Sequence, residues 1–169
     1  MSPSEYRCTS VTETQSIAAN LANSLPVGVV IALIGNLGSG KTTFTQGFAK
    51  GLGISEHVGS PTFKLVSEYD GKRGKLIHVD AYRLKGIEDF LNIGGEDILG
   101  DPRAIILIEW GDKLESILPL PEHIGHFSIV SMFISGRTLC LVICIKPNFV
   151  SGRILCFALS SFMDTTIFS

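Results

Sequence analysis

A glycine-rich segment of eight residues combines a lysine and a threonine in a spacing that is typical of phosphate binding. Residues 35–42 read G-N-L-G-S-G-K-T and match G-x-x-x-x-G-K-[ST] at every fixed position. The glycines allow successive backbone N–H groups to turn toward one anion. Lys41 can reach the β- and γ-phosphates of a nucleotide, and the Thr42 hydroxyl can ligate Mg²⁺. The segment therefore predicts a binding loop for a nucleotide polyphosphate.

The residues on either side of the loop predict the elements that would hold it. Residues 29–34 are apolar and rich in β-branched side chains, which is typical of a central strand in a covered parallel sheet. A helix is expected after the loop, since Phe44 and Phe48 lie four positions apart on one helix face, and Gly51 or Gly53 would end it. Strand, loop and helix in this order are the context in which the motif binds phosphate.

Two carboxylates at the ends of predicted strands are candidates to complete the site. Glu109 directly follows the apolar residues 104–108, and Asp80 follows residues 76–79 in the same way. Nucleotide hydrolysis needs Mg²⁺ and a carboxylate that holds the ion or orients water, and ligands of open α/β sheets collect at the carboxyl ends of strands. We expect Glu109 to ligate the metal with Thr42. Asp80 either makes an outer metal contact or activates water, or it is a solvated or helix-capping carboxylate.

Other candidate side chains have two interpretations each. A hydroxyl of Ser60 or Thr62 either senses the γ-phosphate through its metal or water shell, or belongs to a turn fixed by the intervening proline. Trp110 is either a half-buried core residue or an aromatic near the nucleotide or a partner. Arg83 and Arg137 are candidates for a cationic clamp on phosphate, although either alone is more often a surface arginine.

The whole pattern predicts an α/β fold: a P-loop NTPase-like three-layer sandwich with a central, mostly parallel sheet and added antiparallel hairpins. Residues 1–147 are expected to form this ATPase domain, with residues 148–169 as a tail of uncertain structure. The remaining expected elements are a helix from a capping box at 10–13 to Pro26, hairpin strands at 64–69 and 76–82, short helices within 86–102, a strand at 104–108, a short helix capped by Asp112, and strands at 126–134 and 138–145.

Composition narrows the class of protein. The chain has 169 residues, enough for one domain, and its net charge of −2 without a Lys/Arg run argues against a strong nucleic-acid footprint. The N-terminus lacks the apolar core of a signal peptide, and no apolar stretch approaches the ~20 residues that span a membrane. The four cysteines indicate reduced thiols of a cytoplasmic protein, with zinc bound by Cys140, Cys144 and His123 or His126 as an alternative.

Four motifs occur together in the order seen in the TsaE (YjeE) ATPases, and the chain resembles this family over roughly residues 11–145. The motifs are the loop and its first helical turn at 35–44, S-P-T-F at 60–63, H-V-D-A-Y-R-L at 78–84 and I-E-W at 108–110. Two loop positions depart from the family, because Asn36 stands where Asp is usual and Ser39 where Ala is common.

The resemblance implies a Mg²⁺-dependent ATPase that is weak alone and is stimulated by a partner. The implied partner is the threonylcarbamoyl transferase pair (TsaB/TsaD-like), which modifies adenosine 37 of tRNAs that read ANN codons; ATP turnover would reset this complex, and tRNA would be contacted only indirectly. The implied metal ligands are Thr42 and Glu109, and the implied catalytic residues are Lys41, Asp80 and Glu109. The implied nucleotide-binding residues are Thr12, Gly38, Ser39, Gly40, Lys41, Thr42, Thr43 and Arg137.

Functions from other classes are less well supported. A small P-loop kinase acting on a small-molecule acceptor is the main alternative, but kinase lids usually carry several arginines, whereas residues 84–103 contain only Lys85 and Arg103 as cations. The Asn-Lys-x-Asp motif that reads guanine in GTPases is absent. A nucleotide-binding scaffold without turnover would not need the carboxylates Asp80 and Glu109.

Overall fold

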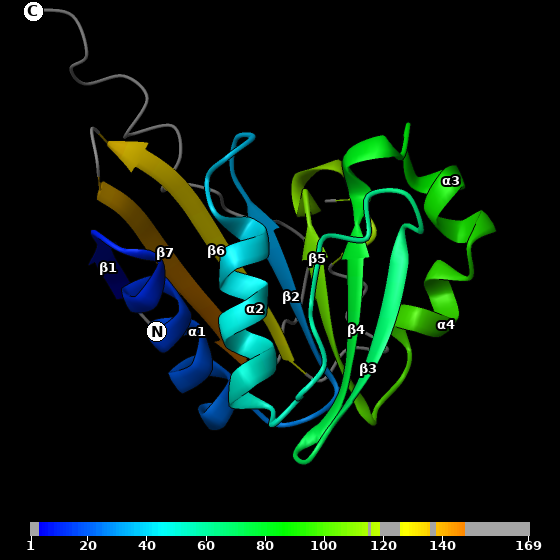
Figure 1. The fold of residues 1–169 in the computed structure, drawn as a ribbon. Coiled ribbons are helices and arrows are strands. Elements are labelled where there is room, and N and C mark those ends of the chain that lie inside the picture. The colour runs from blue at the N-terminus through cyan, green and yellow to red at the C-terminus, as the bar shows by residue number, and fades with distance from the viewer. Residues whose placement is uncertain (1–3, 115, 119–125, 136–137, 148–169) are drawn as a thin grey trace, which may run out of the picture.

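The computed structural model describes residues 4–114, 116–118, 126–135 and 138–147, and it confirms the predicted α/β class (Figure 1). Within these residues, one sheet has the strand order β1-β7-β6-β2-β5-β4-β3. Its elements in chain order are β1 (Ser4–Cys8), α1 (Val11–Ser24), β2 (Val29–Ile34), α2 (Lys41–Gly51), β3 (Val66–Gly71), β4 (Gly74–Asp80), the 3-10 helix η1 (Ala81–Arg83), α3 (Ile87–Asn92), α4 (Gly95–Leu99), β5 (Ala104–Glu109), the 3-10 helix η2 (Gly111–Leu114), β6 (His126–Ser135) and β7 (Thr138–Pro147).

The centre of the sheet is parallel and its margins are antiparallel. Strands β6, β2, β5 and β4 run in the same direction. Strand β3 joins β4 as a hairpin, β7 joins β6 as another, and β1 adds to β7 in antiparallel register. The predicted arrangement of a parallel centre with added hairpins is therefore confirmed, and the parallel strands bring their carboxyl ends to one edge of the sheet.

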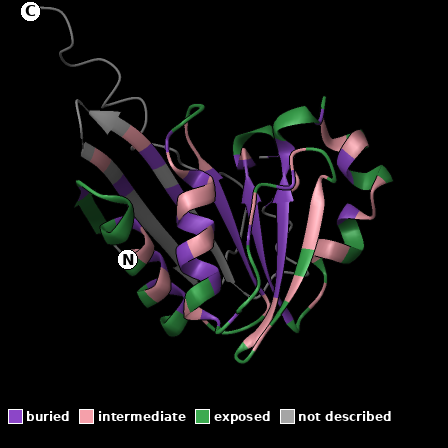
Figure 2. Cartoon of the chain, in the orientation of Figure 1, coloured by how far each residue is buried: buried purple, intermediate pink, exposed green. Residues whose placement is uncertain are grey.

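The two faces of the sheet are covered by different helices, which makes three layers. On one face, Ile31 of β2 packs in a cluster with Phe44 and Phe48 of α2. On the other face, Val30 packs in a second cluster with Phe90 of α3. Successive side chains of a strand point to opposite faces, so both faces of β5, and of β2 up to Leu33, are buried (Figure 2).

Helices α1 and α2 lie side by side across one face (Figure 1) and approach closely. A Cβ atom at Gly47 would come within 2.4 Å of the backbone of Gln15, so glycine is required at this crossing. The buried stripe of α1 accordingly includes the small side chains Ala18 and Ala22, beside Leu21. Alanine fits here because a larger side chain would push the helices apart.

The ends of these two helices lie close to the positions that the sequence predicts. Ser10 accepts a hydrogen bond from the Glu13 backbone N–H at 3.2 Å, as predicted. The Glu13 carboxylate also accepts from the backbone N–H of Thr9, at 2.6 Å. Helix α2 ends at Gly51, and Gly53 adopts the left-handed conformation that follows many helix ends.

Some elements differ from the prediction or lie outside the described residues. Strand β1 was not predicted, because its SEYRC sequence leaves all but Cys8 exposed and gains its order from pairing with β7. Asp112 lies inside η2 and not at a cap before it. The predicted tail at 148–169 lies outside the described residues, so the proposed domain boundary stays a prediction. In the part of the chain that is described, every helix is too short or too polar to cross a bilayer.

Candidate nucleotide-binding site

Three neighbouring strands place the predicted loop and both carboxylates at one edge of the sheet. The phosphate-loop strand β2 lies beside β5, with Leu33 opposite Glu109. Strand β4 lies on the other side of β5, with Asp80 opposite Glu109. Since β4 is an internal strand and not the edge of the hairpin, Asp80 is only 2% exposed. The interpretation of Asp80 as a solvated carboxylate is therefore wrong.

The loop backbone has the conformation that the motif predicts. Gly38 and Gly40 adopt positive φ angles of 79° and 88°, a region that strongly favours glycine. Gly40 is the N-cap of α2 and has no side chain to accept bonds from the first turn of that helix. The uncapped N–H groups and the positive end of an 11-residue helix form an anion site. Inside the loop, the Ser39 hydroxyl is buried and lacks a hydrogen-bond partner among the described groups.

Lys41 is folded back onto its own loop. Its ammonium donates to the backbone oxygens of Gly35 and Asn36, at 2.7 and 2.9 Å, and lies 3.8 Å from the centre of the Trp110 ring. Burial lowers the pKa of Lys41, while the nearby carboxylates of Glu109, Asp112 and Asp80 act in the opposite direction. A cation is thus held at the mouth of the anion site, where phosphate oxygens are better acceptors than the two carbonyls.

Trp110 has the predicted character of a half-buried core residue, and it also lies beside the loop lysine. The residue is half-buried and packs against the cluster beneath α3, as a core side chain does. Its ring also contacts Lys41 and lies 5.2 Å from that of Tyr82. Its φ of 60° is unusual for a bulky residue and is the kind of backbone strain that collects at functional sites.

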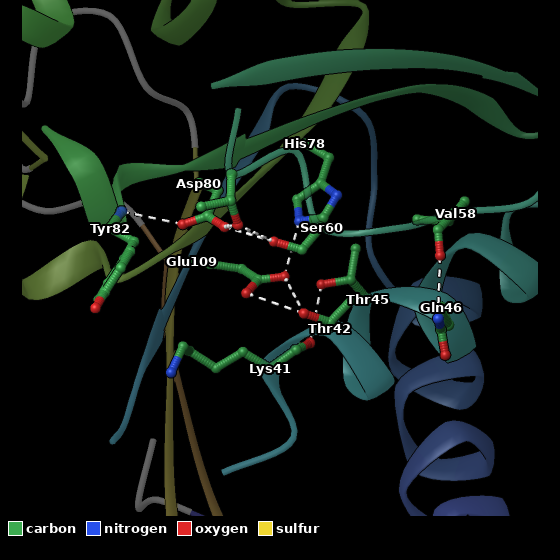
Figure 3. A network of polar contacts seen from close by, with 11 residues as sticks. Lys41, Thr42, Thr45, Gln46, Val58, Ser60, His78, Asp80, Tyr82 and Glu109 are labelled. Atoms are coloured by element: carbon green, nitrogen blue, oxygen red, sulfur yellow. Dashed lines mark hydrogen bonds and ion pairs between the residues drawn. The ribbon is translucent and has the colours of Figure 1, made fainter. Parts of the chain in front are cut away.

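Thr42 and Glu109, the two predicted metal ligands, are in contact (Figure 3). The Thr42 hydroxyl lies 3.0 and 3.2 Å from the two carboxylate oxygens of Glu109. Figure 3 also places His78 in this group, with its Nε2 atom 3.0 Å from Glu109 Oε1. Sequence reasoning assigned no role to His78. The sequence did indicate its position: His78 is a polar residue two positions before Asp80, and alternate residues of a strand lie on the same face.

Asp80 is bonded through both oxygens. Oδ2 accepts from the hydroxyls of Ser60 and Thr62, at 2.5 and 2.6 Å. Oδ1 accepts from the backbone N–H of Tyr82 at 3.0 Å, which caps the short helix η1. The helix-capping interpretation of Asp80 is confirmed, and the same carboxylate also ties residues 60–62 to the sheet (Figure 3).

The other predicted site residues lie at different distances from this cluster. Arg83 is exposed and lies 4.5 Å above the ring of Phe63. Thr12 is exposed in the first turn of α1. Because Gln15, further along α1, lies beside Gly47 of α2, the first turn of α1 is level with the start of α2. The start of α2 carries the half-buried Thr43. Arg137 and His123 lie outside the described residues, as do the side chains of Cys140, Cys144 and His126, so the clamp and zinc predictions stay untested.

The donor set fits magnesium and a nucleotide. Thr42 and Glu109 offer oxygen ligands, which Mg²⁺ prefers, together with substrate phosphates. Among the described residues, no group of three His, Cys, Asp or Glu side chains could hold a metal by itself. A metal at Thr42 and Glu109 would therefore need the phosphates bound by residues 35–42 to complete its coordination. A parallel sheet with this loop after one strand and a carboxylate at the end of the next defines a P-loop NTPase.

Comparisons with known proteins identify the family. The sequence profile of the family described as "Threonylcarbamoyl adenosine biosynthesis protein TsaE" matches residues 8–138, and the chain belongs to this family. The chain is 45% identical over 95 residues to the "tRNA threonylcarbamoyladenosine biosynthesis protein TsaE" of Borreliella burgdorferi, covering 56% of this chain and 69% of the relative. It is 40% identical over 115 residues to the protein of the same name from Bacillus subtilis, covering 68% and 71%.

A solved structure agrees with this assignment. The crystal structure of Bacillus subtilis YdiB is similar with a TM-score of 0.65 and 30% sequence identity, covering 84% of each chain. This similarity confirms the predicted P-loop NTPase fold.

Proposed function

We propose that the protein binds and hydrolyses ATP with Mg²⁺ and acts in the threonylcarbamoyladenosine modification of tRNA. Its proposed partner is the threonylcarbamoyl transferase pair (TsaB/TsaD-like), whose complex ATP turnover would reset. The observation that carries the proposal is the contact between Thr42 of the loop and Glu109 of the neighbouring strand. Family membership supports the place in tRNA modification, since its curated relatives carry that name.

Each residue of the cluster has a proposed task. The N–H groups of residues 38–43 and the ammonium of Lys41 would bind the phosphates. Thr42 and Glu109 would hold Mg²⁺, which when bound neutralises charge on the phosphates. Asp80 would support hydrolysis either by orienting the attacking water or by accepting a proton from that water. Thr12 and Arg137 would contact the nucleotide, as the resemblance implies.

The kinase alternative has little support in the region where a lid would lie. Helices α3 and α4 are short, and their first turns carry carboxylates, namely Glu88 and Asp89, and Glu96 and Asp97. Acidic side chains repel a transferred phosphoryl group, whereas a kinase lid clamps it with arginines. Transfer to water is therefore the favoured reaction.

Phosphate release separates these functions. We expect the purified protein to release inorganic phosphate slowly from ATP and faster when the transferase pair is added. The same assay with GTP, and with nucleosides, sugars and amino acids as acceptors, tests the GTPase and kinase alternatives. Phosphorylation of an acceptor, or no change in turnover with the transferase pair, would contradict the proposal.

Glu109→Ala tests the metal site. Loss of a metal-binding carboxylate should raise the Mg²⁺ concentration for half-maximal phosphate release by about tenfold or more, since changes at or beside metal ligands cost roughly 10- to 100-fold. Binding of ADP in EDTA, measured by calorimetry, should change little. Glu68→Ala, at an exposed carboxylate on β3, is the control. An unaltered Mg²⁺ titration for Glu109→Ala would refute its role as a ligand.

A further inference from the structure

His78 is a buried polar residue on the face of β4 that packs against α2. On the α2-facing side of β4, the residues are Leu76, His78 and Asp80, since alternate residues share a face. Leu107 of β5 lies opposite His78 in the register of the two strands. His78 is fully buried at 0% exposure. An apolar side chain of similar size, such as leucine, would pack at this position as well. The reason for an imidazole here must therefore lie in its hydrogen bonds.

The hydrogen bonds of His78 define its tautomer. Nε2 lies 3.0 Å from Oε1 of Glu109, and an ionised carboxylate can only accept, so the proton of this bond is on Nε2. Nδ1 is buried and has no partner among the described groups. A proton on Nδ1 would therefore be an unpaired buried donor, which is costly. The ring therefore donates from Nε2 to Oε1 of Glu109.

The two donors on Glu109 are not equivalent. Thr42 lies on the loop, and its hydroxyl spans both carboxylate oxygens, at 3.0 and 3.2 Å. That hydroxyl is also the one expected to ligate Mg²⁺, and in that state its oxygen faces the metal. His78 is buried in the sheet and has no competing ligand. The bond from Nε2 to Oε1 is therefore a support of the carboxylate that does not come from the loop.

We propose that His78 is a positioning residue for Glu109: its Nε2–H holds Oε1, so that the carboxylate stays oriented toward Thr42 and the metal. This inference rests on the proposed Mg²⁺-dependent nucleotide binding at the same site. Residues of this kind commonly orient metal ligands, and their loss costs roughly 10- to 100-fold in metal affinity.

Three variants at position 78 test the role of the bond. His78→Phe keeps a buried ring and removes the donor. His78→Gln returns an N–H donor close to the place of Nε2, and His78→Asn is a polar variant whose amide is too short to reach Glu109. Val79→Ala is the matched control, because Val79 is a buried neighbour on the opposite face of β4. Thermal unfolding and calorimetric binding of ADP in EDTA establish that each variant is folded.

The decisive measurement is the affinity of Mg²⁺ for the protein–ADP complex, from ADP titrations at several Mg²⁺ concentrations. We expect His78→Phe and His78→Asn to lower this affinity about tenfold, with ADP binding in EDTA within about twofold of wild type. His78→Gln should recover most of the loss, and Val79→Ala should lower only the unfolding temperature.

Two results would overturn the role of His78: unchanged Mg²⁺ affinity in whichever of the Phe and Asn variants folds, or a loss in the Gln variant as large as theirs. The first would mean that the carboxylate needs no support from the imidazole, and the second that the donor is not the cause. Failure of the proposed function has a different signature, because the wild-type protein would then bind ADP equally well with and without Mg²⁺.

Discussion

Lys41→Ala is expected to abolish ATP binding, with a loss of affinity of about 1000-fold. The Lys41 ammonium lies at the mouth of the anion site, within reach of the phosphates that the loop would bind. Each hydrogen bond between a charged donor and a charged acceptor contributes roughly 1.5–3 kcal/mol, so loss of two such bonds accounts for this effect. Isothermal titration calorimetry with ATP and Mg²⁺ measures it.

A second lysine on the same helix provides the control. Lys50 is exposed in the last turn of α2 and donates to Gln15 Oε1 at 2.7 Å, far from the loop. Lys50→Ala removes the same charge and should leave ATP affinity within about twofold of wild type, since exposed charges are screened by solvent and salt. ATP binding by a folded Lys41→Ala protein with near wild-type affinity would disprove the phosphate role of this side chain.

Asp80→Asn is expected to slow ATP hydrolysis by about 100-fold or more with ATP affinity largely retained, since general-base assistance contributes roughly 10²- to 10⁴-fold. The amide has nearly the shape of the carboxylate but replaces one acceptor by a donor. With its carbonyl oxygen facing the Tyr82 N–H, its NH₂ group would face the hydroxyls of Ser60 and Thr62, which would then accept instead of donating. Phosphate release at saturating ATP, together with calorimetric ATP binding, separates the two effects.

Asp70→Asn is the matched change for this measurement. Asp70 is an exposed carboxylate near the end of the neighbouring strand β3, and its neutralisation should leave the turnover rate unchanged. Full turnover by Asp80→Asn would show that Asp80 only ties residues 60–62 to the sheet. A parallel loss of ATP affinity would instead place Asp80 in nucleotide binding.

The features predicted from sequence are those that depend on neighbouring residues. The loop at 35–42 needs glycine at defined positions, and its conformation follows from those glycines. Strands β2 and β5 are apolar on both faces, which only a covered central strand tolerates. The pairing of Glu109 with the loop was predictable as well, because parallel strands collect their carboxyl ends at one edge.

The features that were missed depend on contacts between distant segments. Strand β1 has no apolar pattern of its own and exists through its pairing with β7. The bonds from Ser60 and Thr62 to Asp80 join residues about twenty positions apart, so spacing alone could not reveal them. The support of Glu109 by His78 crosses between two strands, and it follows only from knowing that β4 and β5 are adjacent.

The contacts of Lys41 with Gly35 and Asn36 mean that ATP would enter a site whose cation already has partners. Binding is then an exchange, in which two neutral acceptors and an aromatic ring are given up for phosphate oxygens. The net affinity is the difference between the two sets, and it is smaller than the strength of the new bonds suggests. In reverse, the same exchange would offset part of the free-energy cost of releasing the product of the proposed hydrolysis, because the Lys41 ammonium would regain these three contacts.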